Sequence, residues 1–161
     1  MGELRELAEG LGYRNVVTVL QSGNLVFAVD KPSGAVAREL EAALRAELGL
    51  DVPILVRTAT ELKRIVARNP LGKVATDGSR HLVTFLSARL APAVARGLER
   101  ADVAPERIAV SGRELHLWLP NGFQRARATK LLKDEKLGVV STTRNWNTVE
   151  KLVELATRMT D

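Results

Sequence analysis

The chain has 161 residues, a net charge of +5 and no cysteine. The lack of thiols excludes disulfides and thiolate-based metal or catalytic sites, and two histidines are too few for most zinc sites, so we expect no metal and no cofactor. No segment approaches the run of about 18 uncharged apolar residues that a membrane span needs. The first residues lack a basic-then-apolar signal pattern, so we expect a cytoplasmic protein without a membrane role.

The first 70 residues predict helices and strands in alternation. In chain order these are a helix over 4–11, strands over 16–20 and 25–29, a helix over 33–48, a strand over Val52–Arg57 and a helix over 58–69. Apolar residues spaced by three and four predict the helices, and β-branched runs predict the strands. The two early strands form a hairpin, because Gly23 and Asn24 between them tolerate positive φ. Thr58 and Glu61 have the spacing of a capping box.

The remaining residues continue this pattern after a polar loop over 71–80. They predict a strand over 81–87, a helix starting at Pro92, strands over 107–111 and 114–119, a helix over Gln124–Lys136, a strand over Val139–Thr143 and a final helix around 149–156. Gly112 and Arg113 provide a tight turn between the middle two strands.

The second half therefore reads βαββαβ, which is the order of a ferredoxin-like unit. The first half reads αββαβ, which is the same order without its opening strand. We expect an α+β protein of two tandem ferredoxin-like halves, residues 1–70 and 71–161, with antiparallel sheets and an extra C-terminal helix. A strand missing from the first sheet predicts an open edge through which two copies could form a homodimer.

The segment Thr142–Thr148 is the main candidate site. It holds Thr143, Arg144, Asn145, Trp146 and Asn147 between the last strand and the last helix. Free N–H groups at a helix start favour an anion, and a guanidinium adds charge and a planar donor fork. The indole offers a stacking face for a base. The alternative is structural, with one amide or hydroxyl capping the helix and the indole in the core.

A second candidate is the basic region between residues 120 and 151. It carries seven basic and three acidic side chains, an excess of +4, whereas the rest of the chain carries 17 basic and 16 acidic ones. On the predicted helix the basic residues form a stripe that phosphate groups could contact, and the alternative is a solvated helix face. The candidate ligand-binding residues here are Arg125, Arg127, Thr129 and Lys130.

Ser22 and Asn24, in the turn of the first hairpin, form a third candidate, which has a ligand-binding role only if the fold brings it near Arg144. His81 and His116 lie in apolar strand runs, so we expect them to be half-buried or on a polar face rather than catalytic.

Three motifs together resemble a known family. They are Leu20–Phe27 (LQSGNLVF), Pro120–Phe123 (PNGF) and Thr142–Thr148 (TTRNWNT). In their order and over essentially the whole chain they are similar to the bacterial domain-of-unknown-function family numbered 1697. The resemblance implies a tandem ferredoxin-like architecture and no particular activity.

Two departures from that family bear on function. Members usually begin with a further strand and a glycine loop ahead of the first helix, whereas Met1 stands here at the helix start. Members also usually carry a serine where this chain has Ala126, so a mechanism that needs a hydroxyl there is not expected in this protein.

These observations leave three hypotheses. The first is a binding module for a phosphate-bearing or other anionic ligand, such as a small molecule or a nucleic acid, at Thr142–Thr148. The second is an enzyme acting on a small polar substrate, with Arg144 stabilising negative charge. The third is a structural role, in which the same motifs hold the halves together or form a dimer interface.

Overall fold

The computed structural model describes residues 2–19 and 23–160 and confirms an α+β fold with antiparallel sheets. The chain divides into two compact units. One contains residues 1–63 and 151–161, and the other contains residues 64–150. Each unit is built around its own sheet.

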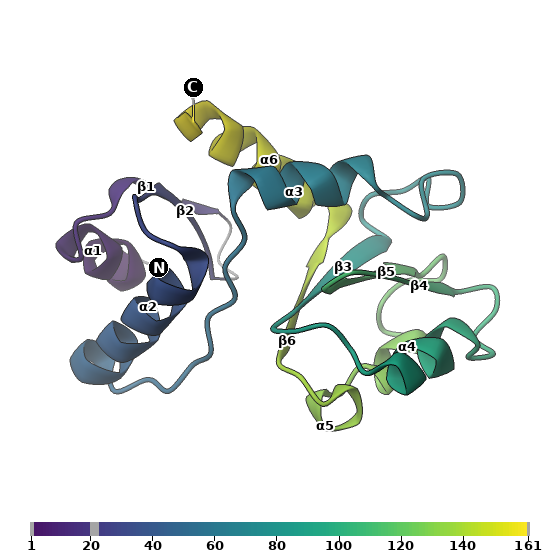
Figure 1. Cartoon of the computed structure of the whole chain (residues 1–161). Coiled ribbons are helices and arrows are strands. Elements are labelled where there is room, and N and C mark those ends of the chain that lie inside the picture. The colour runs from purple at the N-terminus through teal and green to yellow at the C-terminus, as the bar shows by residue number, and fades with distance from the viewer. Residues whose placement is uncertain (1, 20–22, 161) are drawn as a thin grey trace. The chain divides into compact units, whose positions relative to one another are not determined.

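The second unit contains a complete ferredoxin-like sheet (Figure 1). Its elements are β3 (His81–Leu86), α4 (Pro92–Glu99), β4 (Arg107–Ser111), β5 (Glu114–Trp118) and β6 (Ser141–Asn145). The strand order is β4-β5-β3-β6, and every neighbouring pair is antiparallel. The first strand of the unit therefore lies in the middle of the sheet, between the third and the fourth, as two split βαβ crossovers require.

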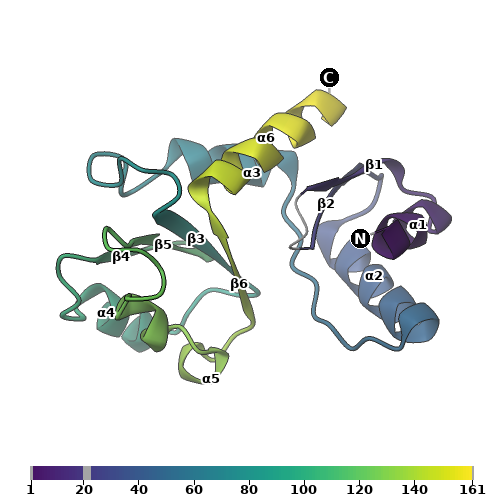
Figure 2. The same cartoon turned by 180° about the vertical axis from the view of Figure 1, so that it is seen from behind.

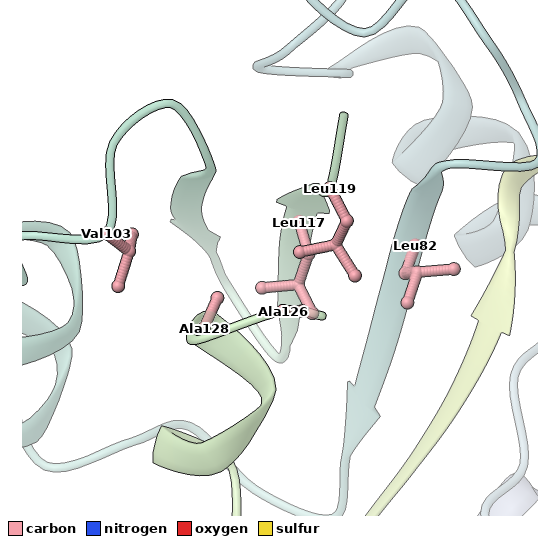
Figure 3. Packing of buried hydrophobic residues seen from close by; sticks show 6 residues of the cluster. All are labelled: Leu82, Val103, Leu117, Leu119, Ala126 and Ala128. Carbon is pink, nitrogen blue, oxygen red and sulfur yellow. The ribbon is translucent and has the colours of Figure 1, made fainter. Parts of the chain in front are cut away.

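The core of this unit is aliphatic. Leu82, Leu117 and Leu119 of the sheet region pack with Val103, Ala126 and Ala128 from the loops, as Figure 3 shows. A second cluster forms where the sheet meets α4 and α5 (Asp134–Leu137). All six residues of β3 are buried, as expected for a strand with neighbours on both sides.

The first unit contains a hairpin and two helices. Its elements are α1 (Gly2–Gly10), β1 (Arg14–Val19), β2 (Asn24–Ala28) and α2 (Ser33–Leu48). The helices lie beside one another on one side of the hairpin (Figures 1 and 2). Ala8, Val36 and Leu40 pack there against Tyr13 and Val16. The predicted hairpin and both predicted helices are confirmed.

The strand predicted over Val52–Arg57 is wrong, because these residues form no ladder in the structure. In the order βαββαβ the last strand pairs only with the first, and the described residues of this unit do not include that first strand. A strand without a partner cannot satisfy its backbone groups. The N–H of Ile54 donates instead to Oε1 of Glu41, at 2.9 Å.

The helix predicted over Gln124–Lys136 is also wrong. Residues 124–127 form turns, followed by a short 3-10 helix, η1 (Ala128–Leu131), and then by α5. Lys133 between them is extended, with φ −67° and ψ 137°, so the helical path is broken there. Arg127, Lys130, Lys133 and Lys136 therefore do not form a stripe on one helix.

Two further helices complete the chain, α3 (Ala59–Ala67) and α6 (Trp146–Thr160). The predicted capping box at the start of α3 is confirmed. The Thr58 N–H donates to Glu61 Oε1 at 2.9 Å, and the Glu61 N–H donates to Thr58 Oγ1 at 3.1 Å. Among the described residues, no helix is long and apolar enough to cross a membrane.

Candidate functional site

The segment Thr142–Thr148 covers the end of β6 and the start of α6. The strand lies two residues later than predicted, because it pairs with β3 in a register that sets Thr84 opposite Thr143 and Val83 opposite Arg144. The Oγ1 atoms of Thr84 and Thr143 lie 2.8 Å apart and share a hydrogen bond. The Thr143 hydroxyl is thus engaged with the buried centre of the sheet.

Arg144 is half-buried and lies along its own strand. Its Nη1 donates to Thr142 Oγ1 at 2.7 Å and to the Thr143 carbonyl at 2.8 Å. Burial lowers the pKa of the guanidinium, which still stays protonated at neutral pH. These two acceptors hold the side chain along its own strand.

Two of the first N–H groups of α6 have partners within the protein. The Thr148 N–H donates to Asn145 Oδ1 at 2.9 Å, which makes Asn145 the helix cap. The Trp146 N–H donates to the Gly78 carbonyl at 3.1 Å. Asn147 is exposed and lies so close to Gly78 that a Cβ added there would stand 2.1 Å from Asn147 Oδ1. The structural interpretation accounts for these contacts.

Trp146 is half-buried and packs against a pair of buried histidines, a contact that the sequence did not indicate. Its ring stacks on His81, with centroids 4.4 Å apart and an angle of 7° between the planes. His81 Nε2 lies 3.1 Å from His116 Nδ1, so one ring donates a hydrogen bond to the other. Both histidines are only 1% exposed, contrary to the expectation of half-burial. His81 thus covers one face of the indole.

Burial sets the charge state of this pair. It lowers the pKa of His81 and of His116 from 6.5 to about 4, and His81 adds a smaller repulsive contribution at His116. Both rings are therefore neutral at physiological pH. The alternation of side chains along a strand could have predicted that the two histidines share a face. Positions 81 and 83 of β3 lie on one face of the sheet, and Val83 pairs with His116 of β5.

The second group of candidates lies on residues 120–131, which we call the basic loop. The buried carboxylate of Glu106 anchors it. Oε1 of Glu106 accepts the N–H groups of Arg127 and Ala128 at 3.0 and 2.8 Å, and Oε2 accepts that of Arg127 at 3.1 Å. Glu106 thus holds the start of η1 in place of the α-helical hydrogen bonds that we predicted.

The basic loop turns its small residues inward and its charged residues outward. Ala126 and Ala128 are buried, whereas Arg125, Arg127 and Lys130 are exposed. Two further contacts tie the loop to its surroundings. The Arg127 guanidinium donates a hydrogen bond to the Ala104 carbonyl. The Arg80 guanidinium donates one to the Pro120 carbonyl.

Phe123 is the most exposed of the large apolar side chains, at 63%. It stands in the same loop, two residues before Arg125. Thr129 is half-buried, and its Oγ1 donates to the Ala126 carbonyl at 3.3 Å. We predicted the arginines, Thr129 and Lys130 as site residues on a helix, and they lie instead on an anchored loop.

Ala126 stands where members of the family usually carry a serine. Ala126 packs in the apolar cluster of Figure 3, with 4% of its surface exposed. A side chain at this position points into the core, so a serine there would not face a substrate.

Of the two hairpin candidates, the structure describes Asn24. Asn24 is buried, and its Nδ2 donates to the Val19 carbonyl at 3.1 Å, which closes the hairpin. Ser22 lies outside the described residues. Whether these two residues lie near Arg144 therefore stays a prediction.

The remaining polar groups offer little for metal or acid–base chemistry. Among the described residues, no group of three or more histidine or acidic side chains is arranged to hold a metal ion. His81, His116 and Glu106 are buried and hydrogen-bonded within the protein, so none of the three is exposed as a general base.

Comparison with known proteins indicates a family but no activity. A family model described as "Protein of unknown function (DUF1697)" matches residues 1–116. This match ends before the Pro120–Phe123 and Thr142–Thr148 motifs. No curated protein was found to be similar to the chain.

One solved structure is a close structural match. It is the conserved bacterial protein SP0830 from Streptococcus pneumoniae, with a TM-score of 0.76 and 18% sequence identity. The match covers 97% of this chain and 88% of the other. At this level of identity the similarity establishes the fold alone.

Proposed function

We propose, for a chain that belongs to the DUF1697 family of proteins of unknown function, that it binds a phosphate-bearing ligand through the basic loop. The ligand class that best fits the side chains is single-stranded nucleic acid. One observation carries the proposal: Phe123 is 63% exposed and shares an anchored loop with two exposed arginines.

An exposed phenylalanine beside exposed arginines offers an apolar ring face together with positive charge. Single apolar residues are common on protein surfaces, so the combination, and not the exposure alone, supports binding. The face of a phenylalanine ring can stack an unpaired base, a contact worth about 1–3 kcal/mol per base. Arginines nearby can pair with the phosphates on either side of that base.

The anchoring of the loop supports binding rather than mere exposure. Glu106 holds two backbone N–H groups, and Ala126 and Ala128 are inserted into the core. The loop backbone is therefore ordered before any ligand arrives, which lowers the entropy that binding must overcome. The excess charge of +4 between residues 120 and 151 adds a favourable field for a polyanion.

The basic loop supports this proposal better than the start of α6. There, Asn145 and the Gly78 carbonyl accept hydrogen bonds from two of the first N–H groups, and His81 stacks on one face of the indole. Arg125 and Arg127 have exposed side chains, whereas Arg144 is half-buried. We therefore place the ligand on the basic loop, with Arg144 outside the contact.

Fluorescence anisotropy with a labelled short oligo(dT) tests the proposal. The wild-type protein should bind with an affinity that falls steeply as salt is raised. Phe123→Ala should weaken binding about 5-fold to 100-fold through lost stacking. Arg125→Ala should weaken it and reduce the slope of log affinity against log salt by about 1, since one phosphate contact is lost.

Arg96→Ala provides the matched control, because it removes an equal charge from an exposed position on α4. It should leave the salt slope unchanged. Equal losses for Arg96→Ala and Arg125→Ala would show that only net charge matters and would contradict a site on the loop. So would Phe123→Ala binding as tightly as wild type.

A further inference from the structure

The basic loop leaves the sheet directly after a tryptophan. Trp118 is the last residue of β5, and the loop begins two residues later, at Pro120. Leu117 and Leu119, on either side of Trp118, belong to the core cluster that Figure 3 shows. Successive side chains of a strand point to opposite faces of the sheet, so Trp118 lies on the face away from that cluster.

The indole of Trp118 is half-buried, and its N–H is in contact with solvent. Among the described residues, Trp118 makes no side-chain hydrogen bond and no ring contact, whereas Trp146 stacks on His81. Every fully buried side-chain nitrogen and oxygen in this part of the chain has a hydrogen-bond partner. The indole N–H of Trp118, which has none, must therefore reach water.

An exposed arginine stands opposite Trp118 in the sheet. The register pairs Arg107 of β4 with Trp118, and paired residues of neighbouring strands lie on one face with their Cβ atoms about 4.5–5.5 Å apart. Within the described residues, the Arg107 side chain makes no ion pair and no hydrogen bond. Its charge therefore faces solvent beside the indole.

Two contacts join the start of β4 to the basic loop. The carboxylate of Glu106, the residue before Arg107, accepts the backbone N–H of Arg127 at 3.0 Å. The Arg127 guanidinium donates a hydrogen bond to the Ala104 carbonyl, three residues before Arg107. The two arginines therefore belong to segments that are held against one another.

A tight turn keeps the exposed phenylalanine close to the end of β5. The Gly122 N–H donates to the Leu119 carbonyl at 3.0 Å, and the Cα atoms that such a turn joins lie within about 7 Å of each other. Phe123 follows this turn directly, and Trp118 precedes it directly. The basic loop and the end of the sheet at Trp118 and Arg107 are thus parts of one corner of the second unit.

The charge of the second unit favours a polyanion beyond the basic loop. Residues 64–150 carry 15 basic and 8 acidic side chains, an excess of +7, whereas the rest of the chain carries 9 basic and 11 acidic ones. Two of the 8 acidic side chains, Glu106 and Glu114, are also buried. A surface with this excess attracts an extended chain of phosphates.

We propose that the ligand continues from the basic loop onto this end of the sheet, where Trp118 stacks a second unpaired base and Arg107 contacts the phosphate beside it. This second contact rests on the proposed function, because it extends the same binding site. Stacking on both Phe123 and Trp118 needs two unpaired bases of one strand. The site therefore selects a single strand over a mononucleotide, which has one base, and over a duplex, whose base faces are covered.

Intrinsic fluorescence tests the second contact, because Trp118 and Trp146 are the only tryptophans. A base stacked on an indole quenches its emission. In the Trp146→Phe variant only Trp118 emits, and saturating short oligo(dT) should quench it. In the Trp118→Phe variant only Trp146 emits, and the same oligo(dT) should leave its emission unchanged, because Trp146 lies outside the proposed contact.

Binding measurements by anisotropy separate aromatic stacking from apolar bulk. Trp118→Leu should weaken the binding of labelled oligo(dT) about 5-fold to 100-fold, since a base no longer has a ring to stack on. Trp118→Phe keeps an aromatic face and should bind nearly as wild type does. Arg107→Ala should reduce the slope of log affinity against log salt by about 1, whereas the matched control Arg96→Ala should not.

The outcomes distinguish this contact from the proposed function. Suppose that oligo(dT) binding depends on Phe123, but Trp118→Leu binds as wild type does and Trp118 emission is unchanged at saturation. The second contact is then overturned, and the site on the basic loop stands. Quenching of Trp146 in place of Trp118 would also overturn it, because the second base would then lie at the start of α6. Failure of the wild-type protein to bind oligo(dT) at all would overturn both.

Discussion

The two units of this protein follow one order of elements but complete it to different extents. The second forms a four-stranded sheet with its first strand in the middle, whereas the first stops at the β1–β2 hairpin. Residues 52–57 show how this difference arises. They include Val52, Ile54 and Val56, all β-branched, and yet they form no strand. Strand propensity therefore counts only where a neighbouring strand is available to receive the hydrogen bonds.

The second crossover of each unit provides a second contrast. In the first unit it is α2, a regular helix of 16 residues with Val36, Leu40 and Leu44 buried along one face. In the second unit the equivalent stretch is η1 followed by α5, interrupted at Lys133. A buried carboxylate explains part of the difference, because Glu106 binds N–H groups at the start of η1. The irregular crossover also carries the exposed residues of the proposed binding site.

The largest expected effect tests the incompleteness of the first core. Leu115→Ala in the second unit should lower the free energy of unfolding by about 2–5 kcal/mol, because the leucine is fully buried on a strand with neighbours on both sides. Leu25→Ala, at the corresponding position counted from the hairpin turn, should cost clearly less, since Leu25 is already half-exposed. Urea denaturation followed by circular dichroism measures both changes.

Tryptophan fluorescence reports the unfolding of the second unit, because the only two tryptophans, Trp118 and Trp146, both lie there. The Leu115→Ala transition should shift in both signals. If Leu25→Ala costs as much as Leu115→Ala, the first core is as well covered as the second, and the contrast between the two units is contradicted.

An intermediate effect is expected from acid, and it should affect one unit only. His81 and His116 have a pKa of about 4 in the folded protein and 6.5 when exposed. Between these values the unfolded chain binds protons that the folded chain does not, so stability falls as the pH drops from about 6.5 to about 4 and then levels off. Each unit of pKa shift corresponds to about 1.36 kcal/mol, so the combined loss should reach a few kcal/mol.

Hydrogen exchange at pH 7 and pH 5 measures this loss for each unit separately. After correction for the intrinsic exchange rate at each pH, the free energy of opening should be lower for β3 and β5 at pH 5 than at pH 7. It should be unchanged for α2, because the first unit contains no histidine. His116→Gln should reduce the pH dependence. An equal loss in both units would assign the acid sensitivity to other groups.

Most of the fold was readable from the sequence because its elements follow simple periodicities. The hairpin over β1 and β2 and the βαββαβ order of the second unit rest on alternation, turns and capping that local sequence encodes. The two wrong elements depend on distant residues. The strand at Val52–Arg57 lacked its neighbour, and the helix at Gln124–Lys136 was interrupted by Glu106, more than fifteen residues away.

The candidate site was predictable only in part, for the same reason. The sequence indicated Arg125, Arg127 and Lys130 by their charge, and these side chains are exposed. It did not indicate that His81 would cover Trp146, because that contact joins β3 to the start of α6 across more than sixty residues. Nor could it distinguish the inward Ala126 from the outward Phe123, since a loop without periodicity gives no rule for which residue is buried.

The smallest expected effect is the difference in stability that the caps of two helices contribute. These helices, α6 and α3, follow the last strand position of each unit. Asn145 caps α6 with one hydrogen bond in a half-buried setting, and Thr58 caps α3 through the exposed reciprocal pair with Glu61. Replacing either cap by alanine should cost about 1 kcal/mol. We expect Asn145→Ala to cost more than Thr58→Ala, because it leaves the Thr148 N–H without its partner at a buried residue. Thermal denaturation of both variants measures the difference, and Asn145→Asp should restore most of the loss because aspartate is an equally good cap. Equal costs would mean that burial adds nothing to this cap. A failure of aspartate to restore stability would mean that Asn145 does more than cap the helix, and the start of α6 would again become a candidate for binding.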